Sequence, residues 1–397
     1  MELSQHERQL LDGARGEAAR TAAEILVALG EIYGAERLLE VRSVQIAGVS
    51  YHNLGDAGLD YLEEAATDGR VMVPATLNPA GMDLVRHREM GISEDFAHQQ
   101  ARVISAFERM GVTITCTCTP YLVGNRPGVG DSLAWSESSA VTFANSVLGA
   151  RTNREGGPSA LAAALCGRTP AYGLHLDKNR RPTLSVEVET PLAGPEDWGL
   201  LGAAIGRAHP AALPFIRGVD VASPEALKAL SAALPTYGGQ PMFHLEGITP
   251  EAGQHASPAD GVAIGRALLE QTRAALEGGD GTIDLVALGC PHASIDELGT
   301  LAKLLDGRQV VAPLWISTSR GVRDRAAAAG LIEIIEASGA RVWSDTCFAV
   351  APLKGRFARV ATDSAKGAYY GRGHNGFAMR VGDLARCVEA AVRGRWS

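Results

Sequence analysis

The sequence lacks the features that would place it in a membrane, on a secretory route or on nucleic acid. No stretch approaches the roughly 18 consecutive apolar residues of a membrane span. Residues 1–30 alternate charged residues with alanine and contain no uninterrupted apolar segment, which excludes a signal peptide. The 37 Lys and Arg residues are outnumbered by 45 Asp and Glu and form no basic block, which disfavours a nucleic-acid partner. These absences predict a cytoplasmic protein.

The short motifs of several common enzyme classes are also missing. The ten histidines form no His-x-x-x-His pair, and neither a Gly-x-Ser-x-Gly elbow nor a Walker loop occurs. One Gly-x-Gly-x-x-Gly match, at residues 371–376, lies too near the C-terminus to open a dinucleotide-binding unit, so we interpret it as a loop. With six cysteines in 397 residues there is no disulfide framework, and in a reducing compartment these residues are thiols or metal ligands.

The residues that are present indicate an α/β protein with mainly parallel sheets. Short β-branched runs alternate with amphipathic helices along most of the chain. Ser93 is placed to cap a helix that ends at Gly111, and a strand is expected directly after it, at 112–116. Ser294 and Glu297 have the spacing of a capping box at the start of another helix.

The length predicts two or three domains with substantial cores. We expect a helical arm over residues 1–40, a first α/β region over 41–237 and a second over 238–397. We place the boundary between the two α/β regions within the Pro- and Gly-rich stretch 235–241.

Three cysteines follow predicted strands. The strands cover residues 112–116, 282–288 and 340–344, and the cysteines are Cys118, Cys290 and Cys347. Ligands of open α/β sheets bind at the carboxyl edge of the strands, so this placement favours a metal site with three thiolates. Unliganded cysteine is also among the most buried residue types, so ordinary core thiols remain the alternative.

The other three cysteines are weaker candidates. Cys116 lies on the same strand face as Cys118 and competes with it as a ligand. Cys166, in an alanine-rich segment, and Cys387, in the last helix, look like packing residues.

Polar segments supply further candidates, each with a structural alternative. Residues 48–58 could form an anion-binding turn at a helix start, or a plain turn between a strand and a helix. Residues 134–159 are rich in hydroxyl and amide groups, which suits the wall of a site or an internal polar network. Lys366 stands among small residues and is either a clamp for a carboxylate or a solvated surface lysine.

Taken together, these segments resemble the catalytic large subunit of the aconitase X family. The matching segments occur in the same order as in the family, and they cover most of the chain from about residue 40 onward. It is carried by the segments Gly48 to Gly58, Thr76 to Asp83, Cys118 to Tyr121, Ala134 to Ser159, Gly289 to Ser294, Thr318 to Arg320, Asp345 to Cys347 and Thr362 to Tyr370.

The resemblance implies an aconitase-like hydro-lyase, built from several α/β domains around an iron-sulfur cluster. The cluster would be held by Cys118, Cys290 and Cys347, with its type, 4Fe-4S or 2Fe-2S, left open. Three thiolates leave one iron open to bind the substrate hydroxyl as it leaves. The alternative from another class is a non-catalytic binding or regulatory relative, with the cluster structural or absent, although the acidic balance argues against binding to RNA.

The same resemblance assigns roles to residues and to a partner. Lys366, Asn78 and the amides around Ser50 are candidates for holding the substrate carboxylate, and Arg320 is a second cationic candidate. Aconitase-like enzymes carry the serine base on a separate swivelling domain. We therefore expect a small partner subunit that supplies this serine, a heterodimer, and no activity from this chain alone.

Two substrates are compatible with the family. The alanine-rich composition, with arginine favoured over lysine, is typical of bacterial members and favours dehydration of cis-3-hydroxy-L-proline to pyrroline-2-carboxylate. The alternative is phosphomevalonate in isoprenoid synthesis, which would need an additional cationic group for the phosphate.

Overall fold

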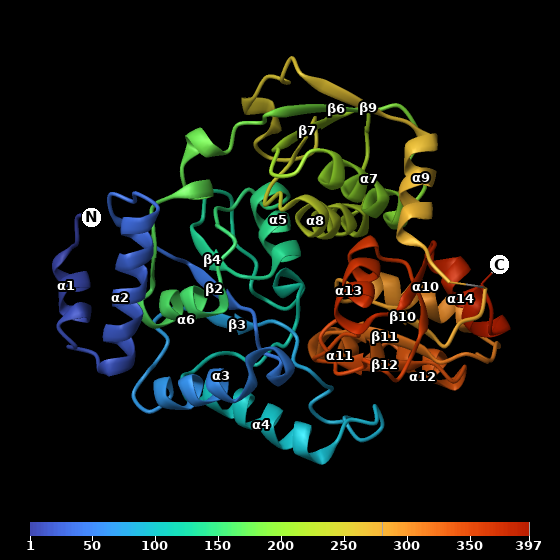
Figure 1. Ribbon diagram of the computed structural model, residues 1–397, viewed down its shortest axis with the longest axis horizontal. Helices are drawn as coiled ribbons and strands as arrows, with labels where there is room; N and C mark the ends of the chain where they lie inside the picture. Colours follow the sequence, from blue (N-terminus) through green and yellow to red (C-terminus); the bar gives the residue numbers. More distant parts are fainter. Residues whose placement is uncertain (280, 397) are drawn as a thin grey trace.

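The computed structural model describes residues 1–279 and 281–396 (Figure 1). Three parallel β-sheets follow one another along the chain, each with its own helices, and a short antiparallel strand pair joins β1 to β5. This confirms the expected α/β class with mainly parallel sheets. We call the three sheets with their helices the N-terminal, middle and C-terminal regions. Asp280 and Ser397, which fall within the expected region 238–397, lie outside the described residues.

The N-terminal region is built on the parallel sheet β3-β2-β4. Its helices α2, α3, α4 and α6 share one apolar core with β2 and β3, and the arm over residues 1–40 contributes Leu10 and Leu26 to that core. Its elements are α1 (Gln5–Leu11), α2 (Glu17–Ile32), β1 (Leu38–Glu40), β2 (Ser43–Ile46), α3 (Tyr51–Ala65), β3 (Ala75–Leu77), α4 (Glu94–Arg109), η1 (Pro120–Leu122), β4 (Leu133–Trp135), α5 (Ser138–Ser146), α6 (Gly157–Cys166) and β5 (Arg168–Pro170).

The middle region contains the parallel sheet β8-β7-β6-β9 and a tightly packed helix pair, α7 and α8. A Cβ at Gly202 of α7 would lie 2.8 Å from the Cβ of Ala233 on α8, so glycine permits this close approach. Its elements are η2 (Gly173–His175), η3 (Asp177–Asn179), β6 (Leu184–Val188), α7 (Pro195–Ala208), β7 (Pro214–Arg217), α8 (Pro224–Gly238), β8 (His244–Leu245), η4 (Ala252–Gln254), β9 (Gly261–Ile264) and α9 (Arg266–Leu276).

The C-terminal region contains the five-stranded parallel sheet β12-β11-β10-β13-β14. The capping box of Ser294 and Glu297 opens α10, as the sequence predicts. Its elements are β10 (Leu285–Leu288), α10 (Ile295–Leu305), β11 (Leu314–Thr318), α11 (Arg320–Ala328), α12 (Leu331–Ala337), β12 (Arg341–Ser344), β13 (Arg359–Thr362), α13 (Ala365–Asn375), β14 (Ala378–Val381) and α14 (Leu384–Arg393).

Helix α8 lies at the centre of the molecule and joins the three regions (Figure 1). It packs against α7 in its own region, against α5 of the N-terminal region and against α13 of the C-terminal region. One apolar core includes Trp135, Leu230 and Leu285, one residue from each region. The suggested boundary stretch 235–241 begins inside α8, and β8 and β9 beyond it complete the sheet that β6 and β7 begin.

Two local expectations are wrong. Residues 112–116 form no strand. The N–H groups of Thr113 and Thr117 do donate to the carbonyls of Ala75 and Leu77, each at 2.9 Å, but the Leu77 N–H donates to the Thr115 hydroxyl at 3.2 Å in place of a backbone carbonyl, and Cys116 leaves the extended conformation with φ 41°. Only Thr113 makes an isolated bridge. Residues 371–375 belong to the end of α13 and not to a loop, and Gly376 caps that helix with φ 73°.

Candidate active site

The carboxyl edges of the N-terminal and C-terminal sheets face each other. The Ala80 N–H, after β3, donates to the Asp345 carbonyl, after β12, at 2.8 Å. The Ser50 hydroxyl, after β2, donates to the Val350 carbonyl at 3.1 Å. Loops that leave parallel strands therefore converge from two sheets at one place, which is where α/β proteins bind ligands.

Cys118, Cys290 and Cys347 meet at this junction. Each is 7% exposed, and Cys290 and Cys347 directly follow β10 and β12. Burial raises the pKa of the Cys118 thiol to about 12 and also raises the pKa values of Cys290 and Cys347. Cys347 raises the pKa of the other two, so the three sulfurs lie within electrostatic range of one another.

Two of the three sulfurs are contacted by backbone N–H groups. The His292 N–H donates to Cys118 Sγ at 3.2 Å, and the N–H groups of Ala349 and Val350 lower the pKa of Cys347. Across residues 1–279 and 281–396, no three His, Cys, Asp or Glu side chains are arranged to hold a single metal ion. A cluster places its thiolates on different irons, so they need not converge on one point. Three buried sulfur donors that influence one another are the kind of soft ligand that an iron-sulfur cluster takes.

The remaining cysteines lie elsewhere. Cys116 is fully buried with φ 41°, and its charged neighbours are Asp345 and Arg320. Cys166 belongs to the apolar core of the N-terminal region and Cys387 to that of the C-terminal region. The structure therefore places Cys118 with Cys290 and Cys347, and leaves Cys116 outside this group.

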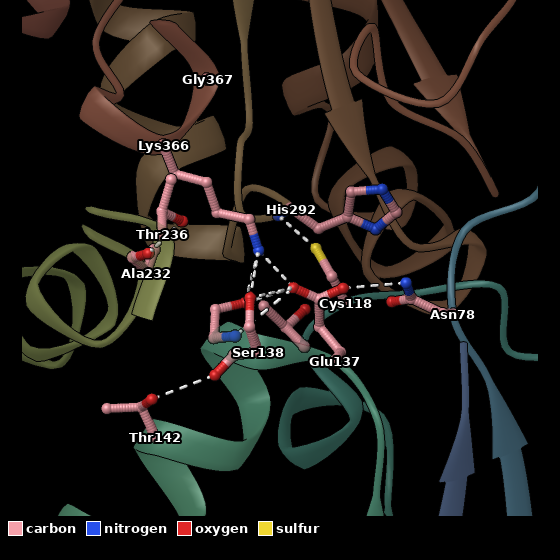
Figure 2. Close-up of polar contacts among 12 residues, drawn as sticks. Asn78, Cys118, Glu137, Ser138, Thr142, Ala232, Thr236, His292, Lys366 and Gly367 are labelled. Carbon is pink, nitrogen blue, oxygen red and sulfur yellow. Dashed lines mark hydrogen bonds and ion pairs between the residues drawn. The ribbon is translucent and has the colours of Figure 1, made fainter. Parts of the chain in front are cut away.

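An ion pair between Lys366 and Glu137 spans the junction (Figure 2). Lys366 lies in the first turn of α13 and is 7% exposed, and Glu137 is the N-cap of α5. The Lys366 ammonium also lies 3.4 Å from the Ser138 hydroxyl and 3.3 Å from the Ser139 hydroxyl. The Lys366 ammonium thus joins the N-terminal and C-terminal regions next to the cysteines.

The pair is ionised despite its burial. Burial alone would raise the pKa of Glu137, but the Lys366 ammonium and the Asn78 amide lower it to about 2. Burial alone would lower the pKa of Lys366, but the Glu137 carboxylate, together with the neighbouring cysteine sulfurs and Tyr370, holds the pKa above its ordinary value. Lys366 lowers the pKa of each of the three site cysteines, so its positive charge acts on all three sulfurs.

Asn78 and Ser50 lie on the same edge, with partners inside the protein. The Asn78 amide donates to Glu137 Oε2 at 2.9 Å, and Gln45 donates to the Asn78 carbonyl oxygen at 3.4 Å. The Tyr51 N–H beside Ser50 donates to the Gln100 side chain at 3.0 Å. That helix start is capped by Gln100 and does not present this amide to a ligand.

Arg320 is held by two buried carboxylates. Its guanidinium donates to Asp345 and, at 3.2 Å, to Asp83, which are 2% and 1% exposed. Asp83 in turn accepts the Ser344 N–H at 2.8 Å, at the end of β12. The network fixes the loop that carries Cys347.

Two residues that the sequence analysis did not select are central to the site. Glu137 belongs to the polar segment 134–159, and the signal that could have marked it is an acidic residue directly before a helix of hydroxyl side chains. His292 follows Cys290 by two residues and is fully buried. Burial lowers the pKa of His292 to about 4, so its imidazole is neutral.

The three regions correspond to three domains of one family. Residues 1–178 match the aconitase X first domain, residues 182–274 the second domain and residues 283–393 the third domain. None of the helices in the described ranges has the length and apolar character needed to cross a membrane.

Relatives of known name agree with this match. The phosphomevalonate dehydratase large subunit of Methanothermobacter thermautotrophicus is 48% identical over 93% of both chains. The cis-3-hydroxy-L-proline dehydratase of Pseudomonas aeruginosa is 40% identical over 99% of this chain and 70% of the relative. The crystal structure of Thermococcus kodakaraensis aconitase X in its holo-form superposes with a TM-score of 0.93, at 41% identity, over 98% of this chain and 100% of that one.

Fold, site and relatives together define an enzyme of the lyase class, because the named relatives are dehydratases, which are hydro-lyases. The matches cover all three regions of the chain and run through the cysteine loops. The chain belongs to the aconitase X family.

Proposed function

We propose that this chain is the large subunit of an iron-sulfur phosphomevalonate dehydratase, located in the cytoplasm. The observation that carries the proposal is the meeting of three buried cysteines beside the Lys366–Glu137 ion pair, at the junction of two sheets. The arrangement combines soft metal ligands with a buried charged pair, which suits removal of a hydroxyl group and of a proton from a small acid.

The relatives favour phosphomevalonate over hydroxyproline. The named phosphomevalonate relative is 48% identical over 93% of its length, whereas the named hydroxyproline relative is 40% identical over 70% of its length. The composition had favoured hydroxyproline, but composition reports on the genome and carries no information about site chemistry. The alternative substrate from the sequence analysis is therefore the better supported one.

Cys118, Cys290 and Cys347 would hold the cluster, whose type we leave as 4Fe-4S or 2Fe-2S. When bound, the cluster would supply a Lewis-acidic iron for the leaving hydroxyl. The backbone N–H groups that point at Cys118 and Cys347 favour the thiolate form that iron requires.

Lys366 and Asn78 would bind the substrate carboxylate. Both already donate to a carboxylate, that of Glu137, from opposite sides. The contacts of Lys366 with Ser138 and Ser139, at 3.4 and 3.3 Å, are long for hydrogen bonds, so these are the ones a substrate would replace. Glu137 keeps Lys366 charged and aimed at the cysteines. For Arg320, the two carboxylate contacts favour a role in positioning the Cys347 loop.

A small partner subunit would supply the serine base. The archaeal relatives are named large subunits, which implies a second chain. The test is anaerobic co-expression of this chain with a candidate small subunit, followed by iron and sulfide analysis and by assays with both substrates. We expect iron in the large subunit, turnover of phosphomevalonate only by the pair, and none of hydroxyproline. Turnover of hydroxyproline alone would reverse the substrate assignment.

Arg154 is our candidate for the substrate phosphate. The backbone of Arg154 forms an isolated parallel bridge with Trp135, and Trp135 in β4 pairs with Gln45 in β2. Paired side chains lie on one face of a sheet, and the Gln45 side chain reaches Asn78, so Arg154 stands on the face that carries the site. Its side chain is exposed, and its guanidinium forms no hydrogen bond or ion pair with the described residues, in contrast to Lys366 and Arg320.

Arg154→Ala should therefore raise KM for phosphomevalonate about 10- to 100-fold with little change in kcat, because a charge-assisted hydrogen bond contributes about 1.5–3 kcal/mol. Steady-state kinetics of the assembled enzyme measures the split between the two constants. Arg181→Ala is the matched control, since Arg181 is another exposed arginine, in the middle region, and should leave KM unchanged. An unchanged KM in Arg154→Ala would remove Arg154 from the phosphate site.

A further inference from the structure

We infer that His292 is a positioning residue that holds the three cysteine loops in the arrangement that binds the cluster. This inference rests on the proposed function, because it concerns the group that the cysteines would hold. His292 is fully buried and lies in the loop of Cys290, two residues further along the chain.

The imidazole connects the other two cysteine loops. His292 Nε2 lies 2.9 Å from the Thr346 carbonyl, one residue before Cys347. His292 Nδ1 lies 2.9 Å from Thr117 Oγ1, one residue before Cys118. One ring therefore contacts the immediate neighbours of two cysteines and belongs to the loop of the third.

The partners fix which nitrogen carries the proton. A carbonyl oxygen can only accept, so Nε2–H donates to Thr346 and Nδ1 accepts from the Thr117 hydroxyl. The Thr117 oxygen then accepts the Thr119 N–H at 3.2 Å. Both ring nitrogens are satisfied inside the protein, which excludes His292 as a fourth ligand of the cluster in this arrangement.

The backbone of His292 is held as firmly as its ring. Its N–H donates to Cys118 Sγ at 3.2 Å, and its carbonyl accepts from the Lys228 ammonium at 3.1 Å. Lys228 lies on α8 and pairs with Glu297 of α10. The contact chain thus runs from the central helix through His292 to all three cysteine loops, across both sheet edges.

The test compares His292→Gln with a matched buried histidine. His244 is also fully buried and its Nε2 also lies close to a backbone carbonyl, that of Arg180 at 2.8 Å, but it belongs to the middle region. The full chain and each variant are reconstituted anaerobically, iron and sulfide per chain are measured, and iron release to a chelator is followed by absorbance. Thermal unfolding of the metal-free chains measures how far each substitution lowers the stability of the fold.

We expect His292→Gln to release iron at least tenfold faster than wild type. Loss of a group that orients metal ligands typically weakens metal binding by about 10- to 100-fold. His244→Gln should have a similar effect on thermal unfolding and release iron at the wild-type rate. Thr117→Val, which removes only the hydroxyl partner, should also accelerate release, and Thr117→Ser, which keeps the hydroxyl, should not.

The outcomes separate this inference from the proposed function. If the wild-type chain takes up no iron, the proposed function is wrong and the role of His292 with it. If the wild-type chain loads iron, but His292→Gln and Thr117→Val release it at the wild-type rate, only the positioning role is wrong. If His292→Gln does not fold, the comparison of Thr117→Val with Thr117→Ser decides.

Discussion

Cys347→Ser should abolish iron binding and reduce dehydration about a thousandfold or more, because a Lewis-acidic metal contributes several kcal/mol to such a reaction. The serine keeps the shape of the loop, and its hydroxyl is a poor ligand for iron where a thiolate is required. Iron analysis, the visible spectrum and turnover of the assembled enzyme measure the effect. The Cys118→Ser and Cys290→Ser variants should behave in the same way.

Two other cysteines serve as controls for this result. Cys166 is buried in the N-terminal region, with its thiol 3.7 Å from the Ala19 carbonyl, and Cys166→Ser should keep iron and turnover. Cys116→Ser should also keep iron, since Cys116 is grouped with Asp345 and Arg320 and not with the other sulfurs. Loss of iron in Cys116→Ser but not in Cys118→Ser would exchange their roles. Full iron and turnover in Cys347→Ser would remove the cluster from the proposed function.

Glu137→Ala should destabilise the chain by about 3–5 kcal/mol and abolish turnover. The substitution leaves the Lys366 ammonium buried without its carboxylate, and an unpaired buried charge carries a cost of that order. It also leaves the Asn78 amide without its partner at 2.9 Å. Denaturant unfolding of the metal-free chain measures the free energy, and turnover is assayed separately with the partner subunit.

The double variant Glu137→Gln with Lys366→Met separates stability from function. It replaces the charged pair by neutral groups of similar length, so stability should return close to that of wild type, while turnover should stay absent because the ammonium is lost. Glu63→Gln is the control for an exposed pair, that of Glu63 with Arg102, and should leave both properties nearly unchanged. A stable, active Glu137→Ala chain would show that the pair has no part in the site.

Local patterns predicted the parts of this structure that depend on neighbouring residues. The capping box of Ser294 and Glu297 needs only four residues, and it forms as expected. Cys290 and Cys347 were found because a cysteine directly after an apolar run reports the end of a parallel strand. The strand expected at 112–116 does not form, because the Thr115 hydroxyl accepts the Leu77 N–H and Cys116 adopts a positive φ, and strand propensity includes neither effect.

Contacts between side chains that lie far apart in the chain could not be predicted from the sequence. Glu137 lies 229 residues from Lys366 in the chain, and His292 lies 175 residues from Thr117. An acidic residue before a helix of hydroxyl side chains marks Glu137 only weakly, because its role depends on Lys366, which the C-terminal region brings to it. Composition favoured hydroxyproline, whereas the relatives favour phosphomevalonate, because composition averages over the whole chain and does not report the chemistry of a site.

The placement of the cysteines on two facing sheets also has a consequence during synthesis on the ribosome. Cys118 leaves the ribosome with the N-terminal region, which can begin to fold as soon as its own sheet is complete. Cys290 and Cys347 emerge only after the whole middle region has been made. A half-made chain therefore carries only Cys118 of the three site cysteines. If the three cysteines hold the proposed cluster, the complete ligand set would exist only when Cys347 has emerged, so insertion of the cluster would follow synthesis of nearly the whole subunit.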